Sequence, residues 1–354
     1  MIPYIILISV PIILYILLNN YLSKESTNKI IITVFFGILF ILLAFRNIDI
    51  GIDLTNYKYY FETSSSMTFN EILTSENQIE KGYILLTKIV TLFTDNFQLF
   101  LIIVALLVLV PIYNLYKKNV SKSLIAIIIF VNMSTFAIIF SGLRQSIAIA
   151  LGVLAYKYVK EKNIFKYILI VLLAISFHSS AFILLLMYPL YHIKINIKHL
   201  LIILSTLFLV YLYRMNIFMF LVQFLPEKYQ GYEVVQTGAV LTLILYIIFL
   251  IYSYVITYNN RDYNINGLRN FLLLTIVIQI FASISTVAMR LGYYYIIYIP
   301  ILISQVTQNS SKRFKQISNF AEIIIVIFFI IYFFYNASTG EDILQIFPYK
   351  FINL

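Results

Sequence analysis

The sequence contains no cysteine and no tryptophan, and charged residues make up only 11% of its 354 positions. The lack of cysteine excludes disulfides and thiolate chemistry. A chain that is 62% hydrophobic, with a mean hydropathy of +0.93, has too little polar surface for an ordinary soluble domain. Repeated apolar runs of membrane-spanning length predict instead an all-α polytopic membrane protein.

Motifs for several kinds of chemistry are also missing. The sequence has no glycine-rich phosphate loop, no zinc-ligand spacing, no nucleophile elbow and no run of acids typical of an intramembrane proton relay. Of the three histidines, His192 and His199 lie near lysines at the ends of predicted spans, where we expect an interfacial role. We therefore expect no cofactor and no metal.

The apolar runs, read with their flanking charges, predict about twelve transmembrane helices in one domain covering 1–354. The Met1-Ile2-Pro3-Tyr4 start lacks a basic region and predicts a first span instead of a cleaved signal peptide. Residues 164–193 and 200–213 are expected to include tilted or partly re-entrant helices. The predicted spans are 3–22, 30–45, 97–116, 123–140, 143–159, 164–178, 179–193, 200–213, 238–258, 268–288, 291–307 and 319–336.

Charge alternates between the two sides of this predicted topology. Most of the 25 Lys and Arg residues fall in one set of connections, which places that set in the cytoplasm and both termini outside. The net charge of +10 is thus a topology signal, and nucleic acid is not an expected partner. The large outer segments are 46–96, 214–237 and 337–354, and the first contains an expected amphipathic interfacial helix at 82–93.

Three arginines stand on the outer side, against the charge bias. Arg46 opens the 46–96 segment, Arg144 lies in the first turn of a predicted helix, and Arg290 precedes another span. Arginine binds phosphates with two parallel hydrogen bonds, and a helix N-terminus adds free N–H groups for an anion. Each arginine alone could instead extend its charged end to the interface. Arg214 has apolar neighbours and ranks below the other three.

The outer segments also supply acids, tyrosines and a histidine. Asp49 and Asp53 could pair with Arg46 or hold a divalent ion, although two acids are thin support for a metal. Tyrosines can stack on sugars or simply form an aromatic belt. His178, at the outer end of a span, is a candidate base or a hydrogen-bonded structural group. The other candidate substrate-binding residues are Tyr57, Tyr60, Gln145, Tyr293 and Tyr294.

In order and spacing, these residues resemble the EpsG family, which belongs with the Wzy-type polymerases of exopolysaccharide, capsule and O-antigen. The resemblance spans nearly the whole chain, although relatives often carry Gly-Thr-Asp where this chain has Gly51-Ile52-Asp53. It is carried by Arg46, Gly51, Asp53, Asn56, Tyr57, Tyr60, Phe61, Glu80, Gly82, Tyr83, Arg144, Gln145, Phe177, His178, Arg290, Tyr293, Tyr294 and the ending Phe347-Pro348-Tyr349-Lys350-Phe351.

The resemblance implies a GT-C-like glycosyltransferase in the bacterial cytoplasmic (inner) membrane, with its site facing the periplasm or cell exterior. Such an enzyme transfers a growing glycan from undecaprenyl pyrophosphate to the next lipid-linked repeat, and its expected partners are a flippase and a chain-length regulator. We expect Arg144 and Arg290 to bind pyrophosphate, Arg46 to join their charge cluster, and His178 or Asp53 to act as the base. Two alternatives are a lipid-linked oligosaccharide flippase and a membrane acyltransferase acting on surface glycans.

Overall fold

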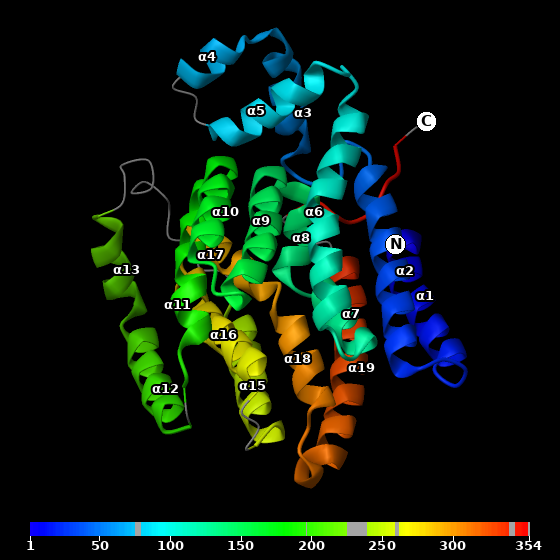
Figure 1. The fold of residues 1–354 in the computed structure, drawn as a ribbon, viewed down its shortest axis with the longest axis vertical. Helices are drawn as coiled ribbons and strands as arrows, with labels where there is room; N and C mark the ends of the chain where they lie inside the picture. The colour runs from blue at the N-terminus through cyan, green and yellow to red at the C-terminus, as the bar shows by residue number, and fades with distance from the viewer. Residues whose placement is uncertain (75–78, 196, 225–238, 259–261, 340–343, 353–354) are drawn as a thin grey trace.

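The computed structural model describes residues 1–74, 79–195, 197–224, 239–258, 262–339 and 344–352, and within these ranges the regular structure is helical. Figure 1 shows the elements as a bundle beneath a small layer of short helices. The helices of the first half are α1 (Ile2–Leu18), α2 (Lys24–Ala44), α3 (Leu54–Ser66), α4 (Phe69–Thr74), α5 (Lys81–Thr91), α6 (Phe97–Asn119), α7 (Ser123–Val131), α8 (Ser134–Ser141), α9 (Leu143–Lys160) and α10 (Ile164–Phe177).

The second half continues with a 3-10 helix that follows α10 directly. Its elements are η1 (Ser179–Leu186), α11 (Met187–His192), α12 (Ile197–Leu212), α13 (Arg214–Val222), α15 (Val240–Ile256), α16 (Tyr263–Ala282), α17 (Thr286–Ile296), α18 (Ile299–Gln308), η2 (Lys312–Phe314) and α19 (Lys315–Thr339).

Among the described residues, four helical segments are long and apolar enough to cross a membrane. They are α2, α6, α16 and the 28-residue segment Lys312–Thr339, and the number rises to seven if each of three bent helix pairs is one span. Large apolar side chains stay exposed along α2, α6 and α19, as lipid-facing surfaces require, whereas α16 is mostly buried inside the bundle. The all-α, polytopic membrane class predicted from the sequence is therefore confirmed.

Two predicted spans are bent where the sequence suggests one continuous run, and a third bend falls where the predicted span 200–213 ends. The predicted span 123–140 is α7 and α8, which meet at 59°. The predicted span 291–307 is α17 and α18, which meet at 41°, and Pro300 at the start of α18 cannot donate the backbone hydrogen bond that would continue α17. α12 and α13 meet at 74°.

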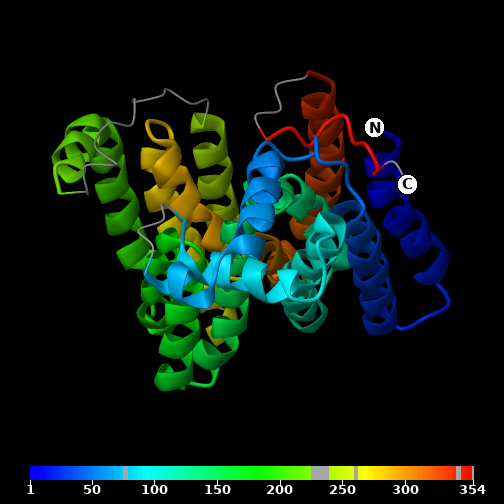
Figure 2. The same ribbon diagram turned by 90° about the horizontal axis from the view of Figure 1, so that it is seen from above.

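Helix α9 lies inside the bundle, where it contacts α6, α8, α10 and α17. α2 packs along α6, and α16 packs against both α15 and α17. Figures 1 and 2 place α1 and α2 at one side of the molecule and α12 with α13 at the other. The interior position of α9 allows its first residues to meet groups from several elements.

The segment 46–96, predicted to lie on the outer side, folds into α3, α4 and α5, which form a layer over one part of the bundle (Figure 1). The helix predicted at 82–93 is present as α5. α5 sits directly on α10, because a Cβ placed on Gly82 would lie 2.5 Å from the Ser176 hydroxyl and 2.6 Å from the Ser176 carbonyl oxygen. Only glycine permits this approach, which fixes the start of α5 above the end of α10.

The C-terminal tail, residues 344–352, runs beside residues 45–52 and holds them in place. The backbone N–H of Asn47 donates to the Lys350 carbonyl at 3.0 Å, and that of Gly51 donates to the Gln345 carbonyl at 2.9 Å. Gly51 has φ +104°, and a Cβ there would lie 2.4 Å from the Phe140 carbonyl oxygen, so the turn inferred from the sequence requires glycine. The segment that leads into α3 is thereby restrained from both sides.

Parts of several predicted connections lie outside the described residues, among them 75–78 of the segment 46–96. The predicted outer segment 214–237 begins as helix α13, and its residues from 225 onward are not described. The same holds for 340–343 and 353–354 of the tail, and for 259–261 of the predicted cytoplasmic connection 259–269.

Candidate functional site

An ion pair between Arg144 and Glu80 joins the bundle to the layer above it. Arg144 is the second residue of α9, and Glu80 immediately precedes α5. The Arg144 Nη1 atom donates to Glu80 Oε2, and the two side chains are 25% and 18% exposed. The other carboxylate oxygen, Oε1, accepts the Ser179 backbone N–H at 2.9 Å. Glu80 therefore connects three elements: α5, α9 and η1.

The charge of Arg144 keeps Glu80 ionised. Burial by itself raises the pKa of the Glu80 carboxyl, but the Arg144 guanidinium and the Ser179 N–H bring that pKa below its ordinary value. The site thus contains a fixed negative charge that neutralises one arginine and holds its guanidinium in one orientation.

Two tyrosines complete the surroundings of Arg144. The Tyr57 hydroxyl, from α3, hydrogen-bonds with the guanidinium, and the Tyr57 ring lies 5.3 Å from the ring of Tyr83. Among the described residues, two buried polar atoms here have no hydrogen-bond partner: Arg144 Nε and the Tyr83 hydroxyl. Buried donors in proteins are almost always paired, so these two atoms retain unused hydrogen-bonding capacity beside the ion pair.

His178 occupies the junction between α10 and η1, outside both helices. Its Nδ1 atom lies 2.6 Å from Ser180 Oγ, which lies 3.0 Å from the Tyr294 hydroxyl. Burial, assisted by the charges of Arg144 and Arg290, lowers the pKa of His178 to about 4 against the opposing effect of Glu80. The imidazole is therefore neutral near pH 7 and has a nitrogen that can accept a proton.

Arg290 lies within α17, whereas the sequence placed it just before a span. Its side chain is exposed, and its backbone carbonyl accepts a hydrogen bond from Gln145 Nε2 at 2.7 Å. Tyr293 and Tyr294, one turn further on, are 2% and 1% exposed. The structure thus brings Arg144, Gln145, His178, Arg290 and Tyr294 into one neighbourhood, with Tyr57 above them.

The two aspartates have separate partners. Asp53, the residue before α3, accepts a hydrogen bond from the Ser141 hydroxyl at 3.5 Å and lies one turn before Tyr57. Asp49 lies 3.6 Å from Lys350 of the tail, and both side chains are exposed. Tyr60 is half-buried and packs against Tyr59, with ring centroids 5.6 Å apart.

Arg46 is placed differently from the other two arginines. Its residue is 2% exposed, and its guanidinium donates to the Leu43 carbonyl and lies 6.0 Å from the ring centroid of Phe140. The tail covers it through a bridge with Phe351. These contacts hold Arg46 beneath the tail, and no contact among the described residues joins it to Arg144.

Sequence reasoning gave no role to Glu80, Tyr83 or Ser180. Glu80 and Tyr83 do belong to the Glu80-Lys81-Gly82-Tyr83 motif that supports the family resemblance, so a signal was present. No sequence signal indicated that Glu80 pairs with Arg144, because the two residues are 64 positions apart.

A many-helix membrane protein with a polar, arginine-containing site at the ends of its helices defines the class of this chain. The EpsG family model matches residues 29–351, nearly the whole chain. The chain therefore belongs to the EpsG family, a Wzy-type polysaccharide polymerase family. No curated protein and no solved structure matches it.

Proposed function

We propose that the chain polymerises lipid-linked oligosaccharide repeat units, transferring the growing glycan from undecaprenyl pyrophosphate to the next lipid-linked repeat. Family membership supports polysaccharide polymerase activity in general, and the site supports this particular transfer. The observation that carries the proposal is the buried, unpartnered Nε of Arg144, held beside His178 and Arg290.

In this reaction the bond between the anomeric carbon and the pyrophosphate oxygen breaks. A bond forms between that carbon and a hydroxyl oxygen of the acceptor sugar, and the hydroxyl proton passes to a base. Arg144 and Arg290 stabilise the charge that develops on the departing pyrophosphate. His178 or Asp53 takes the proton, since the first is neutral and the second lies beside Tyr57.

Tyrosines and an amide near these groups position the sugars. Tyr57 and Tyr294 present hydroxyls to the same neighbourhood as Arg144, and Gln145 fixes the backbone of Arg290. Tyr60, which is half-buried, contributes aromatic surface at its edge, whereas Tyr293 is 2% exposed and supports the site from within the bundle. Arg46, which lies beneath the tail, and Asp49, which lies beside Lys350 of the tail, contribute charge from the adjoining segment.

The chain would cross the bacterial cytoplasmic membrane about twelve times in a GT-C-like arrangement, with the site on the outer face. Both substrates would then be reached from the outer leaflet, after a flippase has delivered them. A chain-length regulator is the other expected partner.

The test is chain growth by the purified protein, supplied with lipid-linked repeat units in vesicles. Arg144→Ala and Arg290→Ala should each lower the rate of polymer formation by about 100- to 1000-fold, as expected for loss of one preorganised charge donor. Arg313→Ala is the matched control, since Arg313 is exposed in η2 and should leave the rate unchanged. Full-length polymer from folded Arg144→Ala and Arg290→Ala proteins would refute the proposal, and translocation without chain growth would favour a flippase.

A further inference from the structure

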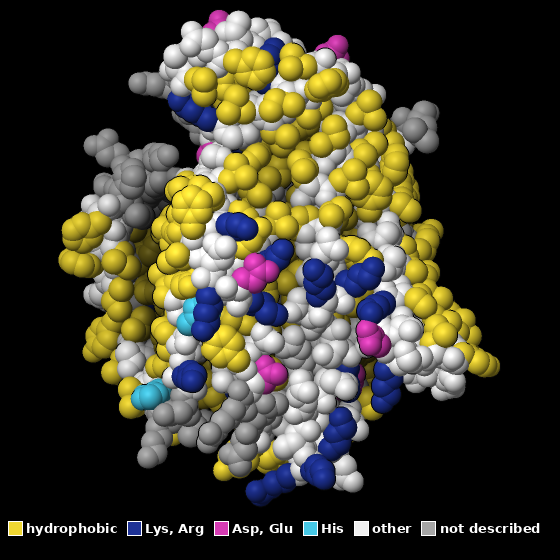
Figure 3. Space-filling view, viewed as in Figure 1, with side chains coloured by type: hydrophobic (Ala, Val, Ile, Leu, Met, Phe, Trp, Pro, Cys, Tyr) yellow, Lys and Arg dark blue, Asp and Glu magenta, His cyan; other side chains and the backbone are white. Residues whose placement is uncertain are grey.

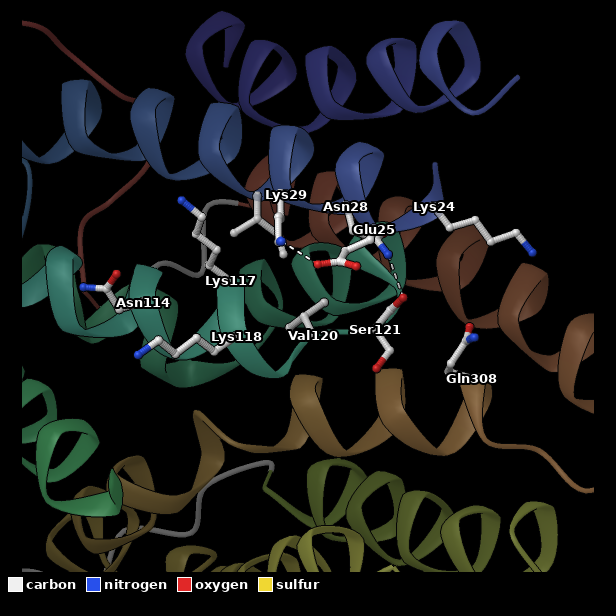
Figure 4. Close-up of a pocket in the computed structure, with 11 residues that line it drawn as sticks. Lys24, Glu25, Asn28, Lys29, Asn114, Lys117, Lys118, Val120, Ser121 and Gln308 are labelled. Carbon is white, nitrogen blue, oxygen red and sulfur yellow. Dashed lines mark hydrogen bonds and ion pairs between the residues drawn. The ribbon is translucent and has the colours of Figure 1, made fainter. Parts of the chain in front are cut away.

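A cavity of about 720 Å³ lies away from the candidate site, at the other ends of α2 and α6. α3–α5 connect the end of α2 to the start of α6, whereas the cavity is bordered by the first residues of α2 and the last residues of α6. Figure 4 shows the side chains around it coming from these helices, the 120–121 connection and α18. This volume lies within the usual range of small-molecule sites.

The lining of this cavity is strongly positive. It includes four lysines, Lys24, Lys29, Lys117 and Lys118, and one acid, Glu25. Glu25 is already paired with Lys29 at 2.5 Å. Among the described residues, Lys24 and Lys118 have no hydrogen-bond or ion-pair partner, so the cavity has positive charge that no described acid neutralises.

Polar groups give the cavity a fixed wall. Asn28 donates through Nδ2 to the Ser121 carbonyl at 2.7 Å and accepts the Ser123 backbone N–H at 3.0 Å. These bonds join the start of α2 to the connection after α6, so the lysines are carried by elements of fixed relative position. Figure 3 shows that Lys and Arg also gather more widely over this face of the molecule, below the α3–α5 layer.

The helices that border the cavity have lipid-facing surfaces. α2 and α6 both qualify as membrane spans, and half of the most apolar stretch of each is buried. Ile30 on α2 is 36% exposed and Val110 on α6 is 49% exposed, within two turns of the cavity-lining lysines. A molecule with an anionic head and apolar chains matches both features, because its head neutralises the lysines while its chains lie along the helices.

We propose that this cavity binds the phosphate headgroup of an anionic phospholipid at the lysine-rich surface of the membrane. The test uses the full-length protein in detergent and measures the retention of phosphatidylglycerol and of phosphatidylcholine by native mass spectrometry. Wild-type protein should retain phosphatidylglycerol in preference. Lys24→Gln/Lys118→Gln should weaken this retention about thirty-fold, or about 2 kcal/mol, since each lysine near an anionic surface contributes about five- to sixfold.

Two matched variants separate the cavity from general surface charge. Lys312→Gln/Lys315→Gln removes the same charge from exposed positions on η2 and α19 and should change retention less than about threefold. Lys24→Arg/Lys118→Arg keeps the charge and should retain the lipid.

Three results would overturn the proposal. Equal losses in the two glutamine variants would show a general surface effect. Binding of inorganic phosphate or glycerol phosphate with no preference between the two lipids would assign the cavity to a free anion. Binding of polyglutamate in place of phosphatidylglycerol would assign it to an acidic protein segment.

Discussion

Replacing Glu80 by glutamine removes the charge that holds Arg144 but keeps an oxygen that can accept the Ser179 N–H. In the wild-type protein both side chains of the pair are about three-quarters buried or more, at 25% and 18% exposed. A hydrogen bond to a charged group is worth about 1.5–3 kcal/mol, and loss of one partner leaves the other charge poorly solvated. Because solvent still reaches the pair, we expect Glu80→Gln to lower the free energy of unfolding by about 2 kcal/mol.

Glu80→Gln should also slow chain growth, because Arg144 loses its fixed orientation as well as its partner. We expect chain growth to fall at least tenfold with Glu80→Gln, and the double variant Glu80→Gln/Arg144→Gln to be no slower than Arg144→Gln alone. The assays are thermal unfolding in detergent and polymer formation from lipid-linked repeats, each measured on all members of the double-mutant cycle.

Glu62→Gln is the matched control for this cycle. Glu62 also lies in the α3–α5 layer, where its side chain is 60% exposed and its carboxylate is 3.8 Å from Lys58 Nζ. Loss of its charge should therefore lower the free energy of unfolding by less than about 0.5 kcal/mol. The reasoning fails if Glu80→Gln behaves like Glu62→Gln, or if the effects of Glu80→Gln and Arg144→Gln on rate simply multiply.

Two further predictions concern the elements that hold this pair. Gly82→Ala should lower both thermal stability and chain growth, because the added Cβ would force α5 away from Ser176. Gly37→Ala is the control and should lower neither, because no atom lies within 4 Å of its added Cβ. Equal behaviour of the two variants would contradict the close contact between α5 and α10. His178 has a pKa of about 4 in the folded protein against 6.5 ordinarily, so its contribution to stability is full above pH 6.5 and is lost as the pH falls toward 4. His178→Asn should therefore flatten the pH dependence of unfolding in that window, and an unchanged pH profile would refute the shift.

The sequence predicts the elements of this fold better than their bends. Apolar runs located α2, α6 and α16 to within six residues at each end, because a spanning helix must be long and apolar whatever its neighbours are. The 59° bend between α7 and α8 falls at Asn132, Ser134 and Thr135, but the continuous helix α16 also contains polar residues such as Asn270 and Thr275, so polar residues do not by themselves predict a bend. Such bends depend on packing between helices, which periodicity does not report.

The candidate site was predictable to a similar extent. The position of Arg144 at the start of a helix follows from local pattern, and its presence in α9 is confirmed. Its pairing with Glu80 and the covering of Arg46 by the tail are contacts between segments far apart in the chain. A single sequence contains no information on which distant segments meet, so these features required the structure.

The tail contacts also set an order for assembly. Residues 344–352 leave the ribosome after every described helix, yet the segment 45–52 relies on them for its backbone hydrogen bonds. The segment that leads into α3, and with it Asp53 and Tyr57, therefore cannot reach its final arrangement before residues 344–352 have been made. The site therefore takes its final form only after every described helix has been made, when residues 45–52 meet residues 344–352.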